Sequence, residues 1–117
     1  MAVNFTNSDE LLKSAQESQL YSKLIAQLKK DFSLANIPFE IEKDIPSDKL
    51  QKILHEKIYY LIMERFSEYL NLLYIVDVPE KAFKTIDVTD VVEVADQVSF
   101  LILKRELQKV WFKAKYT

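Results

Sequence analysis

The stretch 47–80, "SDKLQKILHEKIYYLIMERFSEYLNLLYIVDVPE", carries the strongest periodic signal in the chain. From Leu50 to Leu73 its apolar residues recur at steps of three and four, which is the spacing of one face of an α-helix. The uncharged run 69–76 keeps the same phase, and the proline that follows it cannot continue a helix. We therefore predict one long helix, from Ser47 to about Val76, at the centre of the molecule.

A strand is the alternative for the end of this stretch, because 74–78 is rich in residues typical of strands. The glycine content argues against it. None of the 117 residues is glycine, whereas average usage would give about eight. Phosphate-binding loops, dinucleotide-binding loops and the commonest hairpin turns need glycine at fixed places. The composition therefore favours long helices joined by few turns.

The first 36 residues predict a second helix with a discontinuity inside it. Asn7 or Ser8 caps its start, and Asn36 in a left-handed conformation ends it. The polar run 14–19, "SAQESQ", separates two apolar faces that point to roughly opposite sides. The helix therefore either breaks near Glu17 or packs its first part on a different surface. This N-terminal arm, about residues 1–18, either frays or docks on a partner chain.

The C-terminal segment from about Thr89 predicts a long helix that is apolar on two sides. One face carries Val91, Val94, Ala95, Val98, Leu101 and Ile102, and the second carries Leu103, Leu107, Val110, Trp111 and Ala114. Such a helix lies between two packing partners.

Two short segments complete the chain. Residues 37–46 read as an extended connector with apolar anchors, and residues 79–84 as a single helical turn. The predicted fold class is all-α: an antiparallel three- to four-helix bundle with a long central helix, in one domain of residues 1–117.

Composition and charge exclude several classes of protein. Without cysteine the chain has no disulfides, thiolate metal sites or cysteine nucleophiles. The net charge of −2 argues against a generic nucleic-acid binder. The N-terminus lacks the regions of a signal peptide, and no apolar run approaches the roughly 18 residues of a membrane helix. We expect a cytoplasmic protein with no membrane contact and no cofactor.

Two patterns that resemble catalytic sites are weak. His55 lacks the second histidine that a zinc-protease helix requires four residues later. Glu64 and Glu68 would share one face of the long helix, but a solvated stripe explains them as well as acid–base chemistry does. We therefore predict no catalytic, cofactor-binding or metal-binding residue, and a protein that is not an enzyme.

The chain ends in the basic, aromatic segment "KRELQKVWFKAKYT", residues 104–117. Cations near a helix C-terminus complement the helix dipole, which accounts for them without any ligand. A protein partner is the first alternative, and nucleic acid or an anionic membrane is the second.

The predicted function is that of a non-enzymatic interaction or structural protein that forms a homodimer, because three helices cannot bury all of this apolar surface. The predicted interface residues are Leu103, Leu107, Val110, Trp111, Tyr74, Leu11 and Leu12. Tyr59, Met63 and Tyr74 belong either to the core or to a second contact surface. The alternatives are an adaptor or regulator that binds another protein through the same surface, and then nucleic-acid binding through the basic tail.

Overall fold

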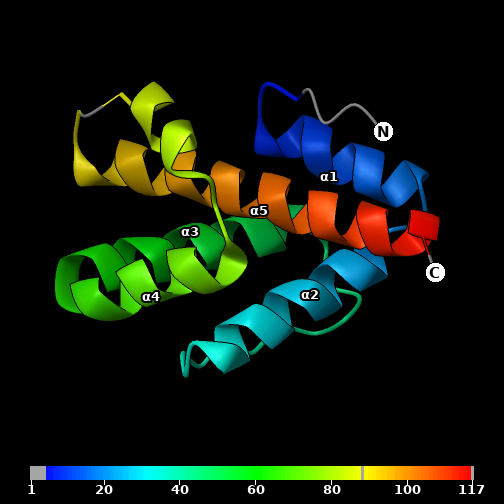
Figure 1. Cartoon of the computed structure of the whole chain (residues 1–117), viewed down its shortest axis with the longest axis horizontal. Coiled ribbons are helices and arrows are strands. Elements are labelled where there is room, and N and C mark those ends of the chain that lie inside the picture. Colours follow the sequence, from blue (N-terminus) through cyan, green and yellow to red (C-terminus); the bar gives the residue numbers. More distant parts are fainter. Residues whose placement is uncertain (1–4, 88, 117) are drawn as a thin grey trace.

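The computed structural model describes residues 5–87 and 89–116, and every regular element in these ranges is helical (Figure 1). The elements are α1 (Ser8–Glu17), α2 (Tyr21–Leu34), α3 (Ser47–Glu64), α4 (Phe66–Val76), the short 3-10 helix η1 (Glu80–Thr85) and α5 (Val91–Tyr116). The predicted all-α class is confirmed, and the strand alternative for 74–78 is not adopted. The arrangement differs from the predicted bundle in where helices break and in which helix is central.

The first predicted helix breaks between α1 and α2, which was one of its two alternatives. Gln19 adopts a left-handed backbone there, with φ of 60°. Leu11, Leu12 and Ala15 of α1 are fully buried, and α1 packs against α2, α3 and α5. The described part of the predicted arm therefore neither frays nor waits for a partner, because its apolar face docks on the core of its own chain.

The predicted long helix over 47–76 is wrong, because the chain breaks at Arg65. In Figure 1, α4 folds back so that it lies antiparallel beside α3, and the two helices are in contact. Leu61, Arg65 and Tyr69 are four residues apart, so Arg65 would lie in the buried stripe of an unbroken helix. Burying an unpaired guanidinium is costly. The non-helical backbone of Arg65 (φ −141°, ψ 56°) leaves its side chain 60% exposed instead.

The centre of the molecule is occupied by α5 and not by the 47–76 segment. α5 packs against α1, α2, α3 and α4, and the middle part of each predicted apolar face is buried, whereas Ala114 near the C-terminal end is exposed. The buried residues are Ala95, Val98 and Ile102 on the first face and Leu103, Leu107 and Val110 on the second. In the view of Figure 1, α1 lies on one side of α5, while α2 and the α3–α4 hairpin lie on the other.

The connector between α2 and α3 is extended and carries apolar anchors, as predicted. Its buried side chains are Ile37, Phe39, Ile41 and Ile45. The ring of Phe39 stacks on Phe32 of α2 with centroids 4.1 Å apart. The Tyr21 hydroxyl donates a hydrogen bond to the Ile45 carbonyl at 2.6 Å. These contacts hold the connector against α2 along its length.

Replacing Gln19 with glycine is expected to raise the free energy of unfolding by about 1 kcal/mol. Gln19 has a positive φ, where a residue with a Cβ is strained and glycine is not. Urea unfolding followed by circular dichroism measures the change. Gln16→Gly, inside α1, is the matched control and should lower stability by roughly 0.5–1 kcal/mol. A loss of stability in Gln19→Gly would contradict the described turn.

Candidate functional site

The residues predicted to form the interface do not form one exposed surface. Leu103, Leu107 and Val110 lie in the core, because other helices of the same chain cover both sides of α5. Leu11 and Leu12 are fully buried in the same core. The prediction that these five side chains contact a partner chain is therefore corrected. Helices of the same chain cover them.

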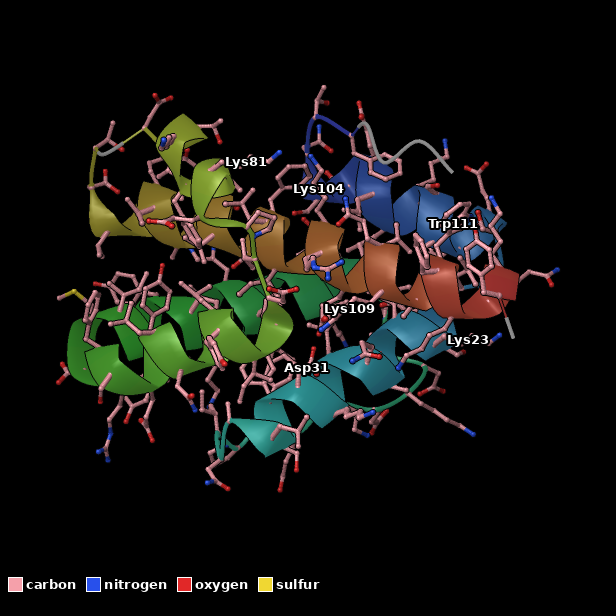
Figure 2. The ribbon with its side chains drawn as sticks, in the orientation of Figure 1. Lys23, Asp31, Lys81, Lys104, Lys109 and Trp111 are labelled. Atoms are coloured by element: carbon pink, nitrogen blue, oxygen red, sulfur yellow. The ribbon has the colours of Figure 1, made fainter. Side chains whose placement is uncertain are left out.

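Two residues of the predicted interface remain accessible, and they lie on different helices. Trp111 of α5 is partly buried, packs edge-on against Phe112 and has Lys115 Nζ 4.8 Å from its ring centroid (Figure 2). Tyr74, near the end of α4, is 82% exposed. Only Tyr74 belongs to the long row of exposed apolar side chains on the α3–α4 hairpin.

This row, which we call the α3–α4 stripe, consists of Tyr59 and Met63 of α3 with Phe66, Leu70 and Tyr74 of α4. Their exposed fractions run from 37% to 82%. The three residues that the sequence assigned either to the core or to a second contact surface are thus at the surface. Residues four apart lie on one face of a helix, so each helix contributes one continuous row. None of the five side chains is charged.

The two rows approach each other at the break of the hairpin. Met63 is the second-last residue of α3 and Phe66 is the first residue of α4, so they flank Arg65. The hollow that Lys57 and Tyr60 of α3 line together with Glu68 of α4 includes none of the five stripe residues. The stripe therefore consists of two uncharged apolar rows that converge where the chain turns from α3 into α4.

A second cluster of interest is buried and charged. Lys109 of α5 projects between α5 and α2, where its Nζ lies 2.5 Å from Asp31 Oδ2 (Figure 2). The same Nζ lies 2.8 Å from Glu106 Oε1 and donates to the carbonyl of Val76 at 3.1 Å. Gln27 Nε2 donates to Asp31 Oδ1 at 3.1 Å. The cluster therefore joins α2, α5 and the last residue of α4.

Glu106 is fully buried and is the unusual member of this cluster. Lys109 is near it but not aligned for a hydrogen bond, and neither carboxylate oxygen accepts one within the described part of the chain. Burial raises the pKa of Glu106 to about 9, and a hydrogen bond with Asp31 contributes to the rise. With this pKa Glu106 is protonated and uncharged at neutral pH, which leaves Asp31 and Lys109 as the ion pair.

Sequence reasoning missed this cluster, although the sequence contains a signal for it. Asp31 continues the buried positions Leu24 and Leu28 of α2 at the helical spacing. Glu106 falls in the same way between Leu103 and Val110 of α5. A charge in an apolar row on each of two long helices indicates a buried pair, provided that the helices face each other.

The candidate catalytic residues do not come together. The break at Arg65 places Glu64 on α3 and Glu68 on α4, so they no longer share one helical face. His55 is a partly exposed helix residue, as predicted, and its Nε2 lies 3.1 Å from the carbonyl oxygen of Val92. Across the described ranges, no group of three or more His, Cys, Asp or Glu residues could hold a metal ion.

Much of the positive charge of the C-terminal segment is engaged within the chain. Arg105 donates to the carbonyl and the carboxylate of Asp77, at 2.9 and 3.0 Å. Lys109 is held in the buried cluster, and Lys113 Nζ donates to Gln27 Oε1 at 3.0 Å. These contacts fasten α5 to its neighbours and leave fewer cations for an external ligand than the sequence suggested.

Two further findings bear on function. Among the helices of residues 5–87 and 89–116, none combines the length and the apolar character that a membrane crossing needs. No protein-family model, curated protein or solved structure matches this chain.

Proposed function

We propose that this chain is a non-enzymatic helical interaction protein that forms a symmetric homodimer through the α3–α4 stripe. The observation that carries the proposal is the stripe itself, five large exposed apolar side chains in two rows on two adjacent helices. Single exposed apolar residues need no explanation, but a larger exposed apolar surface is typical of a contact site.

The composition of the stripe favours a protein partner over a small ligand. Tyrosine, phenylalanine and methionine are enriched in the centres of protein interfaces, and charged residues are depleted there. The stripe contains two tyrosines, one phenylalanine, one methionine and one leucine. The described hollows of the chain lie elsewhere, and none of their lining sets includes Met63, Leu70 or Tyr74.

The absence of charge in the stripe favours a second copy of the chain as the partner. A two-fold interface brings the same surface of both copies together, so a charge on its axis would meet its own like charge. The stripe avoids this cost because none of its five residues is charged. The row on each helix also pairs naturally with an antiparallel copy of itself across a two-fold axis.

The double variant Leu70→Glu with Tyr74→Glu is expected to be a folded monomer, while the wild-type chain sediments as a dimer of twice 13.8 kDa. Both side chains are more than half exposed, so the substitutions leave the core intact and place two like charges in the interface. Sedimentation velocity over a wide concentration range measures the mass, and circular dichroism verifies the fold.

The matched control is Phe112→Glu with Tyr116→Glu, which changes two exposed aromatic side chains on α5. This control should remain dimeric. A wild-type monomer at all concentrations would sink the homodimer and favour an adaptor that binds a different protein through the stripe. Leu107→Asp is unsuitable for any such test, because Leu107 is fully buried and its substitution would disrupt the core.

A further inference from the structure

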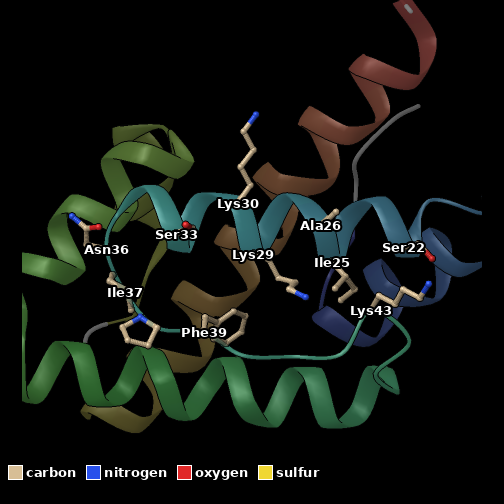
Figure 3. Close-up of a pocket in the computed structure, with 11 residues that line it drawn as sticks. Ser22, Ile25, Ala26, Lys29, Lys30, Ser33, Asn36, Ile37, Phe39 and Lys43 are labelled. Atoms are coloured by element: carbon tan, nitrogen blue, oxygen red, sulfur yellow. The ribbon is translucent and has the colours of Figure 1, made fainter.

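Two hollows flank α2, and their described lining residues include lysines but no aspartate or glutamate. The larger, of about 790 Å³, lies between α2 and the connector that leads to α3 (Figure 3). The smaller, of about 370 Å³, lies between α2 and the last turns of α5. Ala26 and Lys30 line both hollows, so α2 forms the wall between them.

The positive charge of this surface has a structural origin. α2 carries Lys23, Lys29 and Lys30 and a single acidic residue, Asp31. Asp31 is buried and bound to Lys109, so it does not offset the lysines at the surface. The exposed side of α2 is therefore basic, although the chain as a whole has a net charge of −2.

The connector adds a cation on the other side of the larger hollow. Glu40 and Glu42 are exposed and alternate with the buried Phe39 and Ile41, so they point away from the core side. Lys43, in contrast, lines the hollow. The third acid of the connector, Asp44, is also exposed, and none of the three acids is among the residues that line the hollow.

Two of the lysines are placed to contact one ligand. In Figure 3, Lys29 points from α2 toward the connector, and Lys43 projects from the connector beside the same hollow. Lys30 points away from the connector. Each wall of the hollow thus contributes one lysine, and the Lys43 side chain is directed toward Ser22 (Figure 3).

The floor between these lysines is apolar. Ile37 and Phe39, which are largely buried, line it together with the exposed Pro38. The Phe39 ring is held by its stacking on Phe32, with an interplanar angle of 18°. A preformed apolar surface with a few convergent polar groups is typical of sites for small organic ligands, and a volume of several hundred Å³ suits such a molecule. A bare inorganic anion would leave most of this hollow unfilled.

We infer that the larger hollow binds an amphipathic organic anion, with an apolar body on Ile37, Pro38 and Phe39 and its acidic group between Lys29 and Lys43. The apolar part contributes through area removed from water, and the acidic group through charge-assisted hydrogen bonds. This binding site is separate from the α3–α4 stripe, so the inference does not depend on the homodimer.

The test uses the full chain and the fluorescent probe 1-anilinonaphthalene-8-sulfonate, with the uncharged N-phenyl-1-naphthylamine as its matched counterpart. Wild-type protein should bind the sulfonate saturably, at one molecule per chain, and bind the uncharged amine much more weakly. Lys29→Gln with Lys43→Gln should weaken sulfonate binding by at least about tenfold, because both cationic contacts are lost. Added salt should weaken binding to the wild type as well.

Three further variants keep the test decisive. Lys49→Gln with Lys52→Gln makes the same change in net charge on the exposed side of α3 and should leave binding unchanged. Ala26→Glu places a carboxylate at an exposed lining position and should abolish binding. Leu70→Glu with Tyr74→Glu should bind normally, since the stripe is elsewhere. Equal affinity in the Lys29/Lys43 variant, equal affinity for the uncharged amine, or loss of binding in the stripe variant would overturn the inference.

Discussion

Replacing Lys109 with methionine is expected to lower the free energy of unfolding by about 3–5 kcal/mol, the loss typical of breaking a buried ion pair on one side. Lys109 is the only cation that the structure places within 4.0 Å of the Asp31 carboxylate, among the described residues. Methionine keeps the length of the lysine stem and removes the charge, which leaves that carboxylate buried and uncompensated. The carbonyl of Val76 loses its donor as well. Urea unfolding followed by far-ultraviolet circular dichroism measures the loss.

Two further variants test whether the loss of stability in Lys109→Met comes from the broken ion pair and not from any lysine substitution on α5. Lys104→Met makes the same chemical change on the same helix, at a lysine without an ion pair in the described ranges, and should cost no more than about 0.5 kcal/mol. Asp31→Leu with Lys109→Met removes both charges and should recover most of the lost stability, because a buried pair can often be replaced by apolar residues. A loss below about 1 kcal/mol for Lys109→Met would show that the pair behaves as a surface salt bridge.

Stability is expected to fall as the pH rises from about 5 toward about 9, through the titration of Glu106. The pKa of Glu106 is 4.5 in an unperturbed chain and about 9 in the fold, because burial disfavours its charged form. Between these values the folded state holds one proton more than the unfolded state. The free energy of unfolding then falls by up to about 1.4 kcal/mol per pH unit. The contribution is complete below pH 4.5 and lost above about pH 9.

The variant Glu106→Gln isolates this contribution, because its amide keeps the shape of the side chain but does not titrate. Urea unfolding across the range from about pH 5.5 to about pH 8.5 should give a shallower decline in the variant than in the wild type. The variant should be the more stable protein at the alkaline end. Glu93→Gln, at an exposed position of α5, should retain the wild-type slope. Parallel curves for Glu106→Gln and the wild type would contradict a protonated Glu106.

The features that the sequence predicted well depend on contacts between near neighbours in the chain. Asn7 caps α1 by accepting a hydrogen bond from the Glu10 backbone at 2.9 Å. Asn36 ends α2 in the left-handed conformation, with φ of 59°. The alternation of the 37–46 connector and the helical turn after Pro79 are equally local. Each of these depends on propensities that act within four residues, so no partner helix is needed to foresee them.

The features that the sequence predicted poorly involve charged residues at apolar positions of a helix. Arg65, Asp31 and Glu106 all occupy positions that periodicity assigns to the buried side of a helix. The fold handles them in two ways: the helix breaks at Arg65, whereas Asp31 and Glu106 stay buried around Lys109. Which solution applies depends on whether a facing helix carries a matching group, and one-dimensional periodicity contains no such information.

The interface predicted from the sequence also depended on which helices face each other. Leu103, Leu107, Val110, Leu11 and Leu12 were predicted to meet a partner chain, because a three-helix bundle would leave them uncovered. The additional breaks at Gln19 and Arg65 shorten the helices and let them surround α5, which covers all five residues. The exposed apolar surface moves to the α3–α4 hairpin, where Tyr74 remains from the predicted set.

The sequence by itself determined the all-α class, the ends of most helices and the two apolar faces of the C-terminal helix, because a glycine-free chain with strong helical periodicity has few other ways to bury its apolar residues. Only the tertiary structure decided that α5 is central, that Glu106 and Asp31 share a buried cation, and which apolar row stays exposed. Burial and the pairing of charges depend on which helices face each other, and that is a property of the packed molecule.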